Sequence, residues 1–155
     1  MNLILVCRAN VYRSPMAEAV LRARLRDTPA EKIRSAGLAP AAGLPRDERT
    51  QRVLAERGYP PVPSQFAQML NEPMLHWADL VLVMEAQQRH ALLRRFPAAA
   101  GKVWRLGHWL DCEIPDPHGS GLQPLRDTLL LIERCVDRWL SHPSFTSTKS
   151  DPPLS

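Results

Sequence analysis

The chain has 155 residues, a length that fits one domain with a single core and requires neither disulfides nor a structural metal. Its apolar (45%) and charged (23%) fractions are those of an ordinary globular protein, and its net charge of +4 suits an anionic ligand but is too diffuse for nucleic acid. The apolar run at 3–6 is too short for a signal peptide or a membrane span, and no later run approaches the roughly 20 apolar residues that a span needs. We therefore expect a cytoplasmic protein without membrane insertion.

Strands and helices alternate along the sequence. In chain order, apolar runs and helical periodicity predict a strand at 2–6, a helix from 14 to 25, a strand at 32–36, a helix at 47–57, a helical piece at 64–70, a strand at 78–84, a helix at 85–96, a strand at 102–106 and a helix at 122–140. The run at 78–84 is almost entirely apolar, which is typical of a strand buried on both faces of a parallel sheet.

This alternation predicts an α/β fold with helices on both faces of a parallel sheet. We expect a three-layer sandwich with a four-stranded, flavodoxin-like, doubly wound sheet, formed by a single domain over residues 1–142. The polar segment 143–155 is predicted to be a disordered tail. In such folds ligands bind beyond the carboxyl ends of the strands, and Cys7 follows the first strand directly.

The three cysteines, Cys7, Cys112 and Cys135, are odd in number and widely spaced, without a C-x-x-C pair. They predict neither a disulfide framework nor a zinc site. The histidines are scattered without the spacing of metal ligands. We therefore expect no metal and no cofactor.

Cys7 and Arg13 bracket five residues, and Ser14 follows, which gives a C-x5-R-S pattern between a strand and a helix. A loop of this length can turn successive backbone N–H groups toward one tetrahedral anion, with support from the dipole of the next helix. Arg13 can offer a planar fork to two phosphate oxygens. The same positive field, and a hydrogen bond from Ser14, would favour the thiolate of Cys7 as a nucleophile.

The plainer interpretation is that Cys7 only packs at the end of a buried strand, because cysteine is among the most buried residue types. Residue frequencies give this pattern after any one cysteine by chance on the order of once in a hundred. The flanking strand and helix reduce that chance further, so we favour the nucleophile.

Transfer of a phosphoryl group to a thiolate also needs an acid for the leaving oxygen. The candidate is Asp116, which Pro115 and Pro117 enclose in the long loop after the fourth strand. The competing interpretation is that Asp-Pro merely opens a turn. A carboxylate near the bound phosphate would weaken anion binding, so Asp116 would act protonated or stand back from the phosphate.

The stretches "VCRANVYRSPMAEAVL", "SAGL", "ADLVLVM" and "DPHG" resemble, in order and spacing, the low-molecular-weight protein tyrosine phosphatases. The resemblance covers residues 2–141, and "GKVWRLGHWLDCEIPDP" is most similar to the bacterial branch that acts on tyrosine autokinases of exopolysaccharide and capsule export. It implies that family's fold, with Cys7 as nucleophile, Arg13 as phosphate-binding and transition-state residue, Asp116 as general acid and Asn10 as a support of the loop. The implied phosphate-binding loop comprises Cys7, Arg8, Ala9, Asn10, Val11, Tyr12, Arg13 and Ser14.

The sequence departs from the family's usual C-x-G-N-x-C-R-S loop at Ala9 and Tyr12. If position 9 requires a positive φ, alanine costs about 1 kcal/mol there. Tyr12 removes the second cysteine that could protect Cys7 as a disulfide. His118 replaces the family's tyrosine after Asp-Pro, and we expect an aliphatic pocket rim formed by Leu38 and Ala41, with His118 on one wall.

The resemblance implies a tyrosine-phosphorylated protein as the substrate, with a membrane tyrosine autokinase as the candidate, and inorganic phosphate or a similar oxyanion as a ligand. We expect a monomer. Arsenate reduction would need two further cysteines after the third strand, and residues 82–96 contain none. Protein-arginine phosphatases resemble this chain but carry threonine where Val11 stands. A non-catalytic phosphoprotein-binding module remains the alternative from another class.

Overall fold

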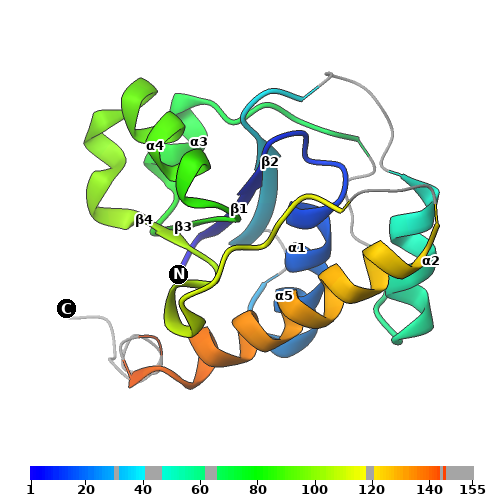
Figure 1. Cartoon of the computed structure of the whole chain (residues 1–155). Helices are drawn as coiled ribbons and strands as arrows, with labels where there is room; N and C mark the ends of the chain where they lie inside the picture. Colours follow the sequence, from blue (N-terminus) through cyan, green and yellow to red (C-terminus); the bar gives the residue numbers. More distant parts are fainter. Residues whose placement is uncertain (30–31, 41–46, 62–65, 118–120, 144, 146–155) are drawn as a thin grey trace.

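The computed structural model describes residues 1–29, 32–40, 47–61, 66–117, 121–143 and 145. Its centre is one parallel sheet of four strands in the order β2-β1-β3-β4 (Figure 1). The strands are β1 (Leu3–Cys7), β2 (Ile33–Gly37), β3 (Leu80–Val83) and β4 (Val103–Arg105). All four coincide with predicted strands, and the order is that of a flavodoxin-like sheet, so the predicted fold class is confirmed.

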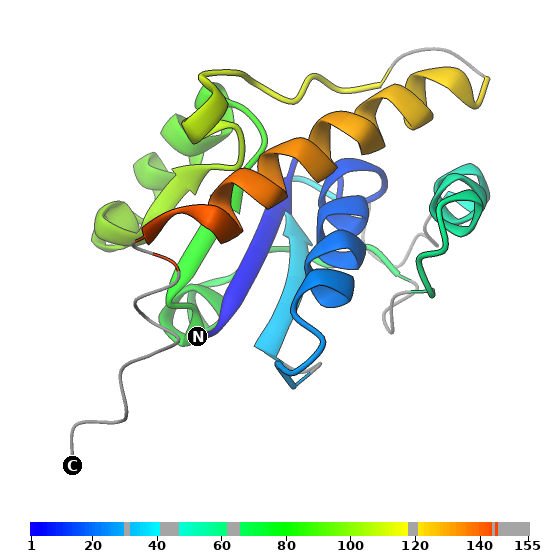
Figure 2. The same cartoon turned by 90° about the horizontal axis from the view of Figure 1, so that it is seen from below.

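Helices cover both faces of this sheet, as Figure 2 shows from below. Alternate residues of β1 divide between two apolar clusters: Leu3 and Leu5 face the cluster that includes residues of α1 and α5, whereas Ile4 and Val6 face the other, with residues of α3 and α4. The helices are α1 (Arg13–Arg24), α2 (Glu48–Glu56), α3 (Glu72–Trp77), α4 (Ala86–Arg95) and α5 (Gln123–Ser141), with short 3₁₀ helices η2 (Pro97–Lys102) and η3 (His108–Leu110).

The helical piece predicted at 64–70 is wrong for its described part, which runs extended alongside the end of β2. There Gly37 N–H donates to the Gln68 carbonyl at 2.9 Å, and Leu70 N–H donates to the Gly37 carbonyl at 2.9 Å. The helix in this region begins later, at α3, where the Asn71 side chain accepts a hydrogen bond from Met74 N–H. Contacts distant in sequence therefore override the local pattern.

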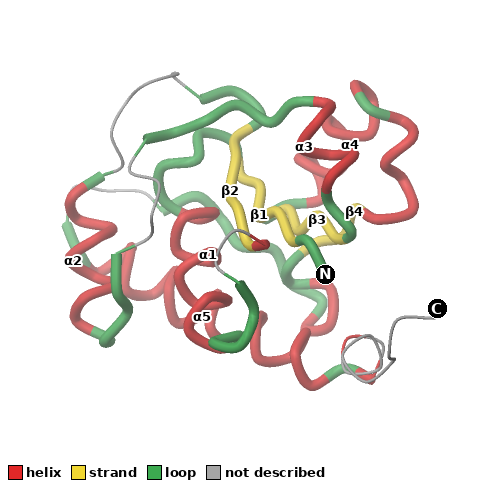
Figure 3. The backbone as a smooth tube through the Cα atoms, turned by 180° about the vertical axis from the view of Figure 1, so that it is seen from behind, coloured by secondary structure: helices red, strands yellow, loops and turns green. Residues whose placement is uncertain are grey.

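The first residues of the tail expected at 143–155 include a buried side chain. Phe145 lies past that boundary, is 6% exposed and packs in the same apolar cluster as α5. The other tail positions from 144 onward lie outside the described residues. Figure 3 shows the N-terminus entering the sheet directly through β1. No helix of the described part is long and apolar enough to cross a membrane.

Candidate active site

The C-x5-R-S segment forms a loop at the carboxyl edge of the sheet. Cys7 is the last residue of β1, and α1 begins at Arg13, so residues 8–12 connect the central strand to the following helix. Cys7 is 2% exposed and pairs in register with Gly37 of the neighbouring strand. The edge is the one at which open parallel sheets bind ligands.

The Cys7 sulfur lies next to two hydrogen-bonding groups of this loop. Asn10 N–H donates to Sγ at 3.2 Å, and the Ser14 hydroxyl lies 3.0 Å from Sγ. The Asn10 side-chain amide donates to Ser14 Oγ at 2.9 Å, so the Ser14 hydroxyl hydrogen points elsewhere. Sγ is its nearer acceptor, because the Ala36 carbonyl lies at 3.5 Å. Both groups can therefore donate to a thiolate, which stabilises negative charge on sulfur.

Asn10 holds the loop in shape through its side chain and its backbone. It is fully buried, and its amide donates to Ser35 Oγ at 3.0 Å while its Oδ1 accepts from Gln68 N–H at 3.0 Å. Its φ of 57° lies in the left-handed region, which asparagine tolerates better than most residues. The positive φ of the loop therefore falls on Asn10, and Ala9 fits without the strain that its replacement of glycine suggested.

Tyr12, the second departure from the usual motif, connects the loop to α2. Its hydroxyl accepts a hydrogen bond from Arg49 Nη2 at 3.2 Å, and the Arg49 guanidinium lies 5.9 Å from the centre of its ring. Tyr12 was expected only to remove a protective thiol, but it also joins the loop to α2.

Gly37 is required where the loop packs against β2. A Cβ at this position would lie 2.8 Å from the Arg8 carbonyl oxygen and 3.1 Å from the Ala9 carbonyl carbon, both backbone atoms. We expect Gly37→Ala to lower the free energy of unfolding by about 1–3 kcal/mol because the loop backbone has to shift. Urea unfolding of this variant measures the loss.

Gly101→Ala is the matched control, since its Cβ would meet nothing within 4 Å. It should leave the urea midpoint close to that of the wild type. Equal midpoints for both variants would contradict the close packing of the loop on Gly37.

Arg13 enters the site from the first turn of α1 and is 3% exposed. Its Nη1 donates to the Ile114 carbonyl at 2.9 Å and forms an ion pair with Glu85. Its Nε lies 3.7 Å from Oδ1 of Asp116. With Nη1 held on one side, the Nε–Nη2 edge is the part of the guanidinium that can meet an oxyanion in the two-point geometry typical of arginine.

Asp116 approaches Arg13 from the loop after η3, and its side chain is 51% exposed. Ile114, two residues earlier, fixes this loop on the sheet because its N–H donates to the Met84 carbonyl at 3.0 Å. The structure thus brings Asp116 within 3.7 Å of Arg13, more than 100 residues earlier in the chain, and Arg13 ends the loop that begins at Cys7. Cys7 itself is not among the residues that line the cavity described below.

Glu85 is a site residue that sequence reasoning missed. It caps α4 in a capping box with Gln88, and it pairs with the buried Arg13. The available signal was its position directly after the third strand, at the same sheet edge as Cys7. Because β3 pairs with β1, an acidic residue there can meet a basic residue of the loop that follows the first strand.

A cavity of about 450 Å³ opens at this edge. Its lining includes the predicted Leu38, Arg13 and Asp116 together with residues of α4 that the sequence did not indicate. Ala41 and His118, the other predicted rim residues, lie outside the described residues. The full lining comprises Arg8, Arg13, Leu38, Ala39, Glu85, Gln87, Gln88, Ala91 and Asp116.

Comparison with known proteins gives consistent relatives over nearly the whole chain. The chain is 38% identical over 141 residues to the low molecular weight protein-tyrosine-phosphatase Ptp of Acinetobacter johnsonii, covering 91% of this chain and 96% of that protein. The crystal structure of the tyrosine phosphatase AmsI of Erwinia amylovora superposes with a TM-score of 0.81 at 33% identity, covering 90% of each chain. The YwlE arginine phosphatase of Geobacillus stearothermophilus superposes with a TM-score of 0.84 at 26% identity, covering 97% of each.

The sequence profile of one family, described as low molecular weight phosphotyrosine protein phosphatase, matches residues 2–150. This match spans nearly the whole chain and agrees with the fold, with the position of the C-x5-R-S loop and with the relatives. The chain therefore belongs to the low molecular weight phosphotyrosine protein phosphatase family.

Proposed function

We propose that this protein hydrolyses phosphotyrosine in proteins through a cysteinyl-phosphate intermediate, with Cys7 as nucleophile, Arg13 as phosphate-binding residue and Asp116 as general acid and base. The observation that carries the proposal is the arrangement of one loop: a buried Cys7 sulfur with two hydrogen-bond donors at 3.0 and 3.2 Å, closed by an arginine whose Nε lies 3.7 Å from a carboxyl oxygen. A binding module would need neither the thiol nor the acid.

The reaction takes two steps at phosphorus. The phosphate lies against the backbone N–H groups of the loop, at the start of α1, and the Nε–Nη2 edge of Arg13 holds two of its oxygens. Cys7 forms a bond to phosphorus, the bond to the phenolic oxygen breaks, and Asp116 gives that oxygen a proton. Asp116 then takes a proton from a water molecule that attacks the cysteinyl-phosphate, which releases inorganic phosphate and restores the thiolate.

Phosphotyrosine is the better substrate than phosphoarginine because of the residue at the centre of the loop. Val11 places an apolar side chain where the arginine phosphatases that resemble this chain have threonine. The aliphatic side chains of Leu38, Ala39 and Ala91 line the cavity next to Arg13 and suit the face of an aromatic ring.

The deciding experiment compares one peptide carrying phosphotyrosine, phosphoserine or phosphoarginine at the same position. We expect phosphate release from the phosphotyrosine peptide with the largest kcat/KM. Preferential release from the phosphoarginine peptide would assign the chain to the alternative activity. No release from any peptide, together with retained binding of phosphotyrosine, would support a binding module.

The physiological substrate is a membrane tyrosine autokinase of exopolysaccharide or capsule synthesis, and the protein acts on it as a monomer in the cytoplasm. The support is the resemblance of residues 101–117 to the bacterial branch and the free state of all three cysteines, which suits a reducing compartment. Immobilised Cys7→Ser protein should retain a tyrosine-phosphorylated kinase from extracts of its own cell. Retention of other phosphoproteins without any such kinase would overturn this assignment.

Glu85→Gln is expected to lower kcat about tenfold, because a misplaced catalytic group costs this much or more. The amide can still accept one hydrogen bond from Arg13 but no longer fixes the guanidinium by charge. Inorganic phosphate should inhibit the variant at an equal or lower concentration than the wild type, because one negative charge has left the site. Steady-state kinetics with phosphate as a competitive inhibitor measures both values.

Glu72→Gln serves as the control, since Glu72 also lies at the N-terminal end of a helix but belongs to α3, outside the cavity lining. Its kcat should equal that of the wild type. An unchanged kcat in Glu85→Gln would show that the Glu85–Arg13 pair does not position the arginine.

A further inference from the structure

Two cysteines that the proposed mechanism does not use lie in contact with each other. The sulfur of Cys112, in the loop after η3, is 3.8 Å from the sulfur of Cys135, in α5. Both are free thiols, Cys135 is 1% exposed and Cys112 is half-buried. A separation of 23 residues gave no sequence signal for this pair.

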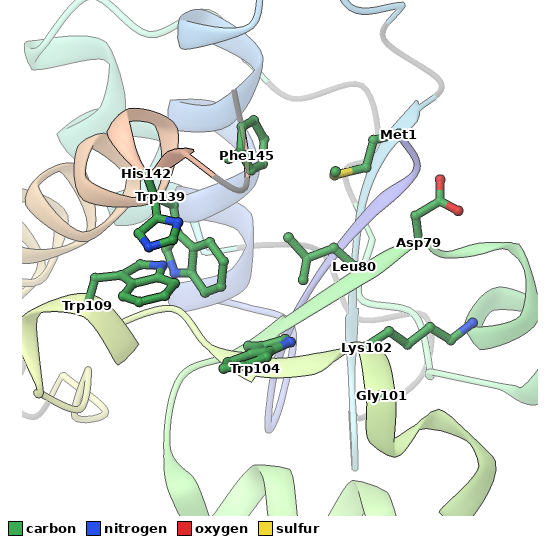
Figure 4. Close-up of a pocket in the computed structure, with 10 residues that line it drawn as sticks. All are labelled: Met1, Asp79, Leu80, Gly101, Lys102, Trp104, Trp109, Trp139, His142 and Phe145. Carbon is green, nitrogen blue, oxygen red and sulfur yellow. The ribbon is translucent and has the colours of Figure 1, made fainter. Parts of the chain in front are cut away.

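The fold holds these two segments together at a second place. Trp139 Nε1 donates to the Leu106 carbonyl at 2.8 Å, and the ring of Trp109 stacks on His142 with 3.7 Å between ring centres. Figure 4 shows Trp109, Trp139 and His142 gathered at one side of a cavity. Because Cys135 lies one helical turn before Trp139, both face the segment around η3. The approach of the two sulfurs is therefore built into the packing of this segment on α5.

A tight turn fixes the backbone of Cys112. Its N–H donates to the Gly107 carbonyl at 3.1 Å, and the preceding Asp111 has a φ of 49° in the left-handed region. A Cβ on Gly107 would come 2.1 Å from the Cys112 carbonyl oxygen, so the chain closes on itself at this glycine. Cys112 is thus held close to α5 and has little freedom to turn away.

The same segment leads directly into the active site. Ile114 lies two residues after Cys112, and its carbonyl accepts a hydrogen bond from Arg13 Nη1 at 2.9 Å. Asp116, two residues further, lies 3.7 Å from Arg13 Nε. A displacement of Cys112 toward α5 therefore acts on a short, hydrogen-bonded segment that carries two contacts of the phosphate-binding arginine.

We propose that Cys112 and Cys135 are a redox-active dithiol that closes to an intramolecular disulfide, and that the closed form lowers catalysis by displacing the segment 113–116. The first part stands on geometry alone, and the second rests on the proposed function. The sulfurs have to move from 3.8 Å to about 2 Å for the bond to form. The tight turn transmits this movement to Ile114 and Asp116.

The chemistry needs a two-electron oxidant, which we assign to the class of hydroperoxides. The thiolate of Cys112, the more exposed residue, attacks one peroxide oxygen, the O–O bond breaks, and a sulfenic acid forms on Cys112. The Cys135 sulfur then attacks that of Cys112, the S–O bond breaks, and the departing hydroxide leaves as water with the Cys135 proton. Two thiols are oxidised to one disulfide, and one hydroperoxide is reduced to an alcohol and one water molecule, or to two water molecules when the oxidant is hydrogen peroxide.

The order of these steps agrees with the surroundings of the two thiols. Burial, together with the neighbouring Cys112, raises the pKa of Cys135 to about 12. Cys135 therefore stays protonated at neutral pH and is the poorer first nucleophile, so Cys112 is the thiol that attacks the peroxide. In the second step the departing hydroxide takes the Cys135 proton as the Cys135 sulfur attacks that of Cys112. A dithiol compound reverses the reaction by thiol–disulfide exchange.

The first experiment uses Cys7→Ser protein treated with hydrogen peroxide, so that the active-site cysteine cannot contribute. Intact mass spectrometry should show the loss of two hydrogen atoms, and digestion should give one peptide pair that joins Cys112 to Cys135. The same treatment of the Cys7→Ser, Cys112→Ser protein should give no such loss. Two thiols that remain open to alkylation after peroxide treatment would overturn the proposal.

The second experiment measures activity in protein with Cys7 intact. Inorganic phosphate occupies the loop during oxidation with peroxide, and both reagents are then removed. We expect kcat to fall about tenfold, since displacement of a catalytic group by about 1 Å can cost this much or more. Dithiothreitol should restore kcat, and Cys112→Ser protein should keep its kcat through the same treatment.

The two readouts separate the proposal from the proposed function. A disulfide that forms by mass without a change in kcat would overturn the coupling to Asp116 while leaving the dithiol established. A protein that hydrolyses no phosphotyrosine but forms the disulfide would overturn only the phosphatase assignment.

Discussion

Replacement of Cys7 by serine is expected to reduce kcat for p-nitrophenyl phosphate by a factor on the order of 10⁴ or more, as removal of a nucleophile does in other enzymes. A serine hydroxyl keeps its proton at neutral pH, and the two donors around the sulfur stabilise a thiolate rather than supply a base. The substitution changes one buried atom, so the fold and the loop should persist. Steady-state hydrolysis and isothermal titration with inorganic phosphate measure both properties.

Cys135→Ser is the matched control, because Cys135 is also a buried cysteine but lies in α5. Under reducing conditions this variant should keep the kcat of the wild type. Retained hydrolysis in Cys7→Ser protein would exclude Cys7 as the nucleophile. Loss of phosphate binding in the same protein would show instead that the loop had collapsed.

The second large effect is expected at Asp116. Asp116→Asn should lower kcat for aryl phosphates by about 10²–10⁴-fold, the range that general acid–base catalysis contributes. The amide keeps the shape of the side chain and a contact with Arg13 but cannot donate the proton. The loss of kcat/KM, which reports the step that expels the phenolic oxygen, should be larger for phenyl phosphate than for p-nitrophenyl phosphate, because a poor leaving group depends more on protonation.

A substitution in the same loop separates this chemical effect from disturbance of the loop. Asp111→Asn changes a fully exposed carboxylate five residues earlier, whose partner is Arg105 at 3.8 Å. Its kcat should stay at the wild-type value with both substrates. An equal loss of kcat/KM for the two leaving groups in Asp116→Asn protein would contradict the role of Asp116 as acid and would indicate a role in shaping the loop.

The elements that the sequence predicts well are those with strong local patterns. The short apolar strands and the apolar face of the long helix α5 are recognisable in the sequence, because burial on one or both faces determines which residues occur there. The loop from Cys7 to Ser14 is predicted for a related reason. Phosphate chemistry restricts the residue types at both of its ends.

What the sequence does not predict depends on contacts between distant segments. Residues 66–70 run extended because their backbone groups form hydrogen bonds with Asn10 and Gly37. No sequence pattern within residues 66–70 indicates those distant partners. Glu85 joins the site only because β3 ends beside β1, which places it against Arg13. The contact between Cys112 and Cys135 likewise exists only once η3 packs on α5.

The structure also changes the interpretation of Ala9 and Tyr12, the two residues that differ from the family's usual phosphate-binding loop. Ala9 raised the question of strain, but the left-handed residue is Asn10, which the Ser35 and Gln68 contacts hold in place. Tyr12 gives up the neighbouring thiol and gains a hydrogen bond from Arg49. With no second cysteine in the loop, the nearest pair of thiols in mutual contact among the described residues is Cys112 and Cys135, which gives redox chemistry another location in this chain.

Transfer of the phosphoryl group through Cys7 can be observed directly as a phosphorylated cysteine. Asp116→Asn protein is mixed with p-nitrophenyl phosphate, quenched within milliseconds and digested, and the peptide containing Cys7 is examined by mass spectrometry and ³¹P NMR. We expect a phosphoryl group on the sulfur of Cys7, formed in a burst that matches the release of one p-nitrophenolate per enzyme. Turnover without any phosphorylated Cys7, or with the phosphoryl group on another residue, would contradict it.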